Sequence, residues 1–214
     1  MTRKIFLLEI LLIAAALAAT MLVYPHLPSQ VPTHWNAQMQ ADGYSPRYAL
    51  YWMGPGFMAG VMLLTWVLPW LSPKRFSVDS FWPTYHQVML MLFFLMAYID
   101  AVLLWVAGGH PLNAGRAIVC GICLFLVLIG NVMGKLRRNF YVGVRTPWTL
   151  ADERVWNATH RFAAKTLIAG GLAGMALAFL VQGIWPLCAI LAGALAPVVY
   201  SLVIYKQLER RGEL

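Results

Sequence analysis

Charged residues are scarce in this chain of 214 residues: they make up 11% of it, and only 8 are acidic. Hydrophobic residues make up 61%, which is far from the balance of a soluble domain. So little polar sequence excludes a separate soluble domain. At about 20 residues per crossing, the chain has room for about six transmembrane helices. We therefore predict an all-α, multi-pass membrane protein.

Cysteines and catalytic motifs are also few. Cys120, Cys123 and Cys188 all fall inside apolar runs, which excludes a disulfide framework and favours inert packing over redox chemistry. No Gly-x-Ser-x-Gly, His-Glu-x-x-His or phosphate-binding loop occurs. We expect no enzyme, no cofactor and no metal site, and an intramembrane enzyme is the least favoured function.

Six apolar runs mark the expected spans. They cover residues 5–24, 51–71, 85–107, 114–134, 164–181 and 187–205. Gly54-Pro55-Gly56 predicts a kink or a late helix start in the second run. Glu9 lies about a turn inside the first run, where we expect it to be hydrated at the interface, with a buried functional acid as the alternative.

The basic residues predict the orientation. All of the 16 lysines and arginines except Arg47 and Arg116 fall in segments that lie on one side if both termini do. Since cytoplasmic loops collect Lys and Arg, both termini and the segment 135–165 are expected in the cytoplasm. The same bias explains the net charge of +8 without direct binding of nucleic acid.

The segment 135–165 is the longest polar stretch. Residues 139–148 should be extended, because Thr146 precedes Pro147. Thr149 followed by Asp152 resembles a capping box, so we expect a short interfacial helix from about Leu150 that leads into the fifth span. Four-residue spacing predicts two faces on this helix, one with Asp152, Trp156 and His160, the other with Arg154, Arg161 and Lys165.

This helix has two functional interpretations. Trp148 and Trp156 could lie at the level of the lipid headgroups, with the basic face toward anionic lipid. Alternatively, the basic residues could hold a bound partner or the head of a lipid. Asp152 and His160 are separated by about 12 Å along the helix, which is too far for them to share a metal ion.

The outer loop 25–50 carries a second polar pattern. His34 and Asn36 alternate in a stretch that Pro32 holds extended, and Asp42-Gly43 turns the chain back toward them. We predict a small polar pocket, or a weak cation site with His26 nearby; the alternative is a hydrogen-bonded lid that only orders the loop.

Asp100 is the most conspicuous polar residue inside a span. It lies about 12 Å below the outer end of its helix, and Arg116 begins the next helix. We predict an intramembrane pair of Asp100 and Arg116, either structural or part of a proton or ligand path.

The two polar regions together resemble the SdpI family of bacterial membrane proteins, which is named for immunity to a secreted antimicrobial peptide toxin. The residues that match the family signature are Asn139, Gly143, Arg145, Thr146, Pro147, Trp148, Glu153, Trp156 and His160. Those that match the N-terminal domain of unknown function that accompanies it are Pro32, His34, Asn36, Asp42 and Gly43. We divide the chain into an N-terminal two-helix unit (1–75) and a four-helix SdpI-like unit (76–214).

The resemblance implies a multi-pass protein of the bacterial inner membrane that gives resistance to a peptide toxin and relays toxin binding to a cytoplasmic transcriptional regulator. The alternative function is a small transporter, or a lipid- or ion-binding membrane protein, that uses Asp100 and the His34 loop. Membrane lipids are expected partners. A homodimer is a further possibility, because small residues recur at four-residue spacing, as in Gly170 and Gly174.

Overall fold

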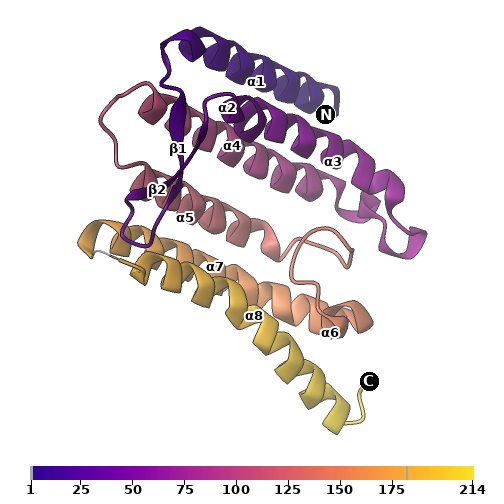
Figure 1. Cartoon of the computed structure of the whole chain (residues 1–214). Coiled ribbons are helices and arrows are strands. Elements are labelled where there is room, and N and C mark those ends of the chain that lie inside the picture. The colour runs from indigo at the N-terminus through magenta and orange to yellow at the C-terminus, as the bar shows by residue number, and fades with distance from the viewer. Residues whose placement is uncertain (1, 182) are drawn as a thin grey trace.

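The computed structural model describes residues 2–181 and 183–214, and its main feature is a bundle of long helices (Figure 1). Within those residues, six helical segments are long and apolar enough to cross a membrane. The predicted all-α membrane fold with six spans is therefore confirmed. The elements that form them are α1 (Thr2–Val23), α2 to α3 (Ala49–Leu71), α4 (Trp82–Ala107), α5 (Ala114–Met133), α7 (Glu153–Leu180) and α8 (Trp185–Arg210).

Both termini lie at one end of the bundle, which we call the termini end (Figure 1). The connections 72–81 and 134–146 lie at the same end, with two 3₁₀ turns, η3 (Lys74–Phe76) and η4 (Val78–Phe81). The opposite end, here the hairpin end, carries the connection between α1 and α2. Both termini on one side agree with the predicted topology, while their cytoplasmic location stays a prediction.

The hairpin end is covered by a two-stranded antiparallel sheet that follows a 3₁₀ turn, η1 (Tyr24–His26). Strand β1 (Gln30–Trp35) pairs with β2 (Ala41–Pro46), and the register is irregular on both sides of His34, which lies opposite Gly43. Asn36 closes the turn, because its Oδ1 accepts the amides of Gln38 and Gln40, both at 3.0 Å. The hydrophilic loop is thus an ordered hairpin.

The second span is continuous but irregular at its start. The predicted disturbance at Gly54-Pro55-Gly56 is a π-helical segment, η2 (Trp52–Gly56), between α2 (Ala49–Tyr51) and α3 (Phe57–Leu71). Pro55 has no amide hydrogen to donate, so the chain widens here instead of completing regular turns.

Across the bundle, α4 contacts α1 and α3 on one side and α5 on the other, α5 contacts α7, and α7 contacts α8 (Figure 1). The main core cluster is built around Tyr85, Phe93 and Trp156, all of them fully buried. A close helix contact joins α7 to α8, where a Cβ on Gly170 would lie 2.8 Å from Ala189 O and 2.9 Å from Gly193 Cα. These small residues therefore serve packing within the chain, and the homodimer stays a prediction.

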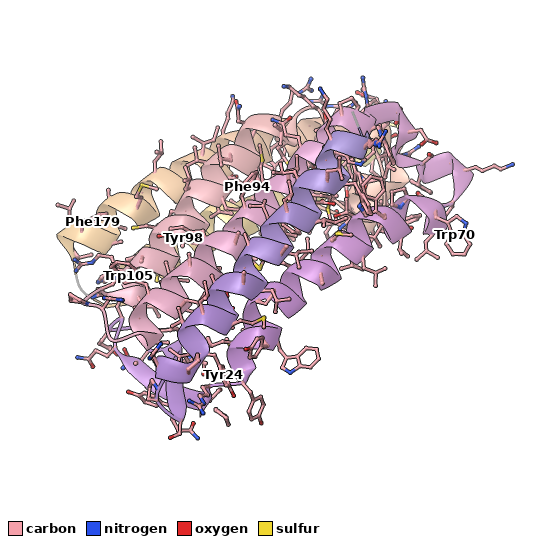
Figure 2. The ribbon with its side chains drawn as sticks, turned by 90° about the horizontal axis from the view of Figure 1, so that it is seen from above. Tyr24, Trp70, Phe94, Tyr98, Trp105 and Phe179 are labelled. Carbon is pink, nitrogen blue, oxygen red and sulfur yellow. The ribbon has the colours of Figure 1, made fainter. Side chains whose placement is uncertain are left out.

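Exposed aromatic residues mark both ends of the bundle. Trp70 lies at the termini end and is 83% exposed, whereas Trp105 and Phe179, which are 53% and 66% exposed, lie at the hairpin end (Figure 2). Aromatic side chains at two levels of a helical bundle are typical of the two membrane–water interfaces.

Candidate functional site

The loop between α5 and α7 is organised by Asn139, whose side chain is fully buried. Its Nδ2 donates to Arg137 O at 2.8 Å and to Val142 O at 3.0 Å. Its Oδ1 accepts the amides of Tyr141 and Val142 at 2.7 and 2.8 Å. Because one amide group satisfies four backbone groups of an irregular turn, Asn139 acts as the internal frame of this loop.

His160 and Trp156 fix the loop to α7. The His160 ring stacks on Trp156 with 4.0 Å between centroids, and both side chains are buried. His160 Nδ1 lies 2.8 Å from Trp156 O and Nε2 lies 3.0 Å from the Val144 amide, so Nδ1 carries the proton and Nε2 accepts. Trp156 Nε1 donates to Leu136 O at 2.9 Å, so this indole is buried within the protein and does not face lipid.

Thr146 and Thr149 form the cap that begins α6 (Pro147–Ala151). The Thr149 amide donates to Thr146 Oγ1 at 3.2 Å, and the Thr146 amide donates to Thr149 Oγ1 at 2.9 Å. Thr146 Oγ1 also lies 3.0 Å from Ser201 Oγ on α8, which ties the cap to the last span. Thr146 is extended as expected before Pro147, with φ −94° and ψ 162°.

The predicted start of the interfacial helix is corrected by this cap. The short helix exists, but Thr146 rather than Thr149 caps it, and it has five residues. Asp152 caps the next helix, α7, by accepting the amides of Arg154 and Val155 at 2.8 and 3.4 Å. α7 then runs without a break into the fifth span, so this span begins 11 residues earlier than expected from 164, at Glu153.

Of the remaining signature residues, Arg145, Pro147 and Glu153 are exposed, whereas Gly143 and Trp148 are partly buried. Arg145 is exposed and donates to Phe140 O at 2.5 Å. Glu153 lines a charged cleft of about 480 Å³ between the 72–81 connection and the loop. Its basic residues are Lys74, Arg75, Arg137 and Arg138. The arginines that we expected on one face of α7 are exposed, as is Lys165.

Two of the five motif residues of the hairpin end line a second cavity, of about 330 Å³. His34 and Asn36 both line it, but most of its wall is apolar, with Met53, Ile99 and Leu103 among the lining residues. His34 Nδ1 lies 2.5 Å from Asp42 Oδ1, and Pro32 is held in β1 opposite Tyr44. The cavity is therefore largely apolar and differs from the small polar pocket that we predicted, and the hydrogen bonds of His34 and Asn36 lie within the hairpin, as in the alternative of an ordered lid.

A metal site is not formed by the described residues: they contain no group of three or more His, Cys, Asp or Glu side chains that could hold an ion. Among the described motif residues, the structure brings only His34 and Asp42 into contact through their side chains. His26 does not join them as a third possible ligand.

The predicted pair of Asp100 and Arg116 is wrong. No ion pair between them occurs in the described chain. Asp100 is 3% exposed and faces Gly54, where an added Cβ would lie 1.8 Å from its Oδ1. Arg116 points elsewhere, with Cζ 5.6 Å from the centroid of the Phe179 ring. Asp100 thus faces the second span and Arg116 faces α7, so the two side chains point away from each other.

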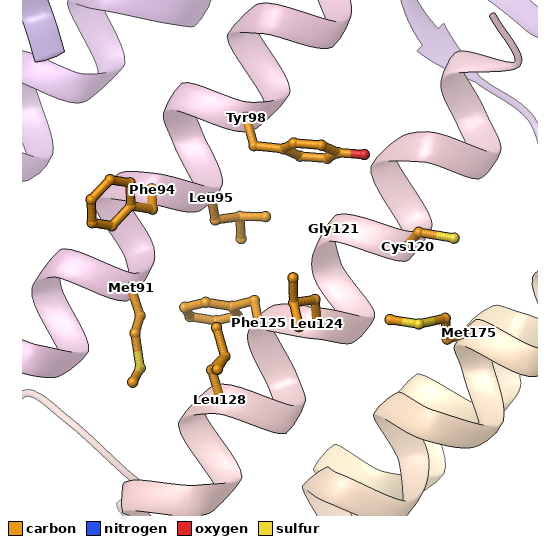
Figure 3. Close-up of a pocket in the computed structure, with 10 residues that line it drawn as sticks. All are labelled: Met91, Phe94, Leu95, Tyr98, Cys120, Gly121, Leu124, Phe125, Leu128 and Met175. Atoms are coloured by element: carbon orange, nitrogen blue, oxygen red, sulfur yellow. The ribbon is translucent and has the colours of Figure 1, made fainter.

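An apolar groove follows the outside of α4 and α5 (Figure 3). Its volume is about 420 Å³, and Phe94, Tyr98, Cys120 and Met175 are among its lining residues. Tyr98 donates to Ala117 O at 3.0 Å and so has its hydroxyl satisfied. Cys120 is half-buried and Cys123 is buried, which agrees with packing roles for both.

Two titratable residues are buried on the other side of α4, and one of them, His86, was not predicted from the sequence. Glu9, expected to be hydrated, is fully buried and accepts a hydrogen bond from Trp66 Nε1 at 3.1 Å. His86 is buried beside Trp66, with 5.5 Å between ring centroids. The signal in the sequence was a titratable residue inside each of two apolar runs.

The fold and the two organised polar regions define a multi-pass membrane protein. Two family models match it: the SdpI/YfhL protein family over residues 135–205, and the Domain of unknown function (DUF1648) over residues 11–59. The Immunity protein SdpI of Bacillus subtilis (strain 168) is 27% identical over 199 residues, which are 93% of each chain. No solved structure matches. These matches confirm the resemblance to the SdpI family that the two motifs predicted.

Proposed function

We propose that this protein is an immunity protein of the bacterial inner membrane that protects the cell from a secreted antimicrobial peptide toxin. The supporting observation is its 27% identity, along 93% of both chains, to a protein named for immunity. In this proposal the termini end faces the cytoplasm and the hairpin end faces outward, in agreement with the distribution of lysine and arginine.

The toxin contacts the cavity at the hairpin end. Its apolar wall accommodates apolar side chains of a peptide, while His34 and Asn36 at the rim supply hydrogen-bonding groups. This end also lies where the toxin arrives from outside, so contact needs no passage across the membrane.

The loop at the termini end relays the toxin-bound state to a cytoplasmic transcriptional regulator. Arg145 and the charged cleft beside Glu153 offer exposed charges to such a partner, whereas Asn139, Trp156 and His160 are fully occupied inside the loop. Membrane lipids surround the bundle between its two levels of exposed aromatic residues.

A resistance assay tests the proposal. The chain is expressed in a Bacillus subtilis strain that lacks Immunity protein SdpI, and growth is measured against the secreted peptide to which that strain is then sensitive. We expect resistance from the wild-type chain. Equal sensitivity with and without the chain, at verified membrane expression, would reject immunity to this peptide.

A cavity-filling variant tests the place of contact. Ile118 lines the cavity, so Ile118→Trp should fill it and abolish resistance. Leu191→Trp makes the same addition on the outer surface of α8, where the side chain is 55% exposed, and should leave resistance unchanged. Full resistance in Ile118→Trp would exclude the cavity as the toxin site.

A small transporter or ion-binding protein is the second candidate function. Asp100 favours it, because this carboxylate is buried and its Oδ1 has no hydrogen-bond partner. Resistance that survives Asp100→Asn but is lost in Arg145→Ala supports immunity with a relay. The reverse pattern supports the transporter.

A further inference from the structure

Glu9, Trp66 and His86 form a polar cluster inside the termini end of the bundle. They come from three helices, α1, α3 and α4, and Glu9 and His86 are 0% and 1% exposed. Each lies within about two turns of one end of its helix, at about 3.6 residues per turn. Neither of the two family motifs includes these side chains.

In Glu9 and in His86, one polar side-chain atom is hydrogen-bonded and the other is not. Trp66 Nε1 donates to Glu9 Oε2 at 3.1 Å. His86 Nδ1 lies 3.2 Å from Trp82 O, and because a carbonyl oxygen can only accept, Nδ1 carries a hydrogen. Glu9 Oε1 and His86 Nε2 are both buried without a partner.

These two free atoms are both acceptors when the carboxylate is ionised and the imidazole is neutral. Two buried acceptors without a donor, one of them charged, are strongly disfavoured in the interior of a membrane bundle. A single hydrogen between the two groups removes this imbalance, since it turns one acceptor into a donor and makes the cluster neutral.

Other titratable groups on the packed elements do not supply that hydrogen. The Tyr85 hydroxyl on α4 donates to Thr65 O at 2.9 Å and is used there. Arg3 and Lys4 are exposed at the start of α1, and α3 has no titratable residue. Tyr141, on the loop after α5, packs against the main core cluster while only partly buried.

We propose that Glu9 and His86 together bind one proton within the bundle. The proton comes from water. It resides either on Glu9 Oε1, as a carboxylic acid that donates to a water molecule between it and His86 Nε2, or on His86 Nε2, as an imidazolium that reaches the Glu9 carboxylate through the same water. Both forms contain the same number of protons, and in both the bridging water supplies the partners that the two free atoms lack. The site is independent of the proposed immunity function.

Infrared spectroscopy of the purified protein in lipid vesicles tests the first form. Asp100 is the other buried carboxyl group, so the measurement uses the Asp100→Asn background. At neutral pH we expect a C=O stretching band of a protonated carboxyl group that is lost in Glu9→Gln. In His86→Phe the band should move to higher frequency, because the acid loses its acceptor, whereas His110→Phe at an exposed position should leave it unchanged.

Nitrogen NMR of histidine-labelled protein tests the second form and needs no change at Glu9, so it remains valid if Glu9→Gln does not fold. The signals of His86 are assigned as those lost in His86→Gln. An imidazolium pattern at neutral pH, or the carboxyl band with a neutral imidazole, supports the proposal. An ionised Glu9 together with a neutral His86 at neutral pH would overturn it.

Discussion

The amide of Val144 donates to His160 Nε2 at 3.0 Å, across 16 residues of sequence. The approach is this close because Gly143 precedes Val144 with φ +106°, and a Cβ there would lie 2.3 Å from the same ring nitrogen. Two residues of the family signature thus act as one structural unit: the glycine admits the ring, and the ring binds the backbone beside it.

Gly143→Ala should therefore destabilise the protein by about 3 kcal/mol, from backbone strain and from the displaced imidazole. Gly134→Ala is the matched control, since nothing lies within 4 Å of its added Cβ, and it should change the free energy of unfolding by less than about 0.5 kcal/mol. Unfolding of both variants in detergent gives the comparison. Equal stability of the two would contradict the close contact.

Asp152 should stabilise the start of α7 in two separate ways, by the hydrogen bonds that its side-chain oxygen accepts and by its negative charge. Asp152→Ala should cost about 1 kcal/mol, while Asn caps a helix nearly as well. The hydrogen bond from Arg154 lowers the pKa of Asp152, so the charge stabilises the folded state above the ordinary pKa of about 3.9 and loses this effect as the pH falls through the folded value. The stability difference between wild type and Asp152→Asn should hence vanish in acid. A difference that grows below about pH 4 would contradict this assignment.

Asp100 should be coupled to Gly54 and not to Arg116. Gly54→Ala places a methyl group against the carboxylate, so its cost should fall by at least about 1 kcal/mol when Asp100 is alanine. Asp100→Asn and Arg116→Gln should be additive within about 0.5 kcal/mol. Double-mutant cycles of unfolding free energy measure both couplings, and coupling only in the second cycle would restore the ion pair.

The contact of α7 with α8 should not tolerate a larger side chain. Gly170→Leu should destabilise by about 2 kcal/mol, because the added atoms meet the backbone of α8. Gly60→Leu adds the same side chain where an added Cβ meets nothing within 4 Å. A small effect of Gly60→Leu beside a large effect of Gly170→Leu, in the same unfolding assay, is the expected result; equal effects would refute the packing role.

Hydropathy and charge were sufficient to predict the six spans and the position of both termini at one end. These properties depend on the composition of about 20 consecutive residues, so local sequence carries them. The start of the short helix α6 was misplaced because Thr146 and Thr149 are both good caps in isolation. Ser201, 55 residues further along the chain, contacts Thr146, and no local pattern shows this.

The candidate sites were predicted unevenly for a related reason. Position along a helix gives depth, so Asp100 and Arg116 were placed at compatible levels, but the direction of each side chain depends on how the helices are rotated. Glu9 was judged by its closeness to the helix end, whereas its burial comes from Trp66 on another span. The motif residues were found from their pattern, and their separate roles needed the tertiary contacts.

The unbroken course of α7 has a mechanical consequence. Its first turn is capped at Asp152 beside the charged loop, and Ala178 in its last turn lines a cavity next to the tip of the hairpin, together with Gln38 and Gln40. A helix of 28 residues spans about 42 Å, and a regular hydrogen-bonded rod of this kind shifts or tilts as a unit. A displacement at one end of α7 should therefore move its other end as well, because the helix has no break that would absorb it.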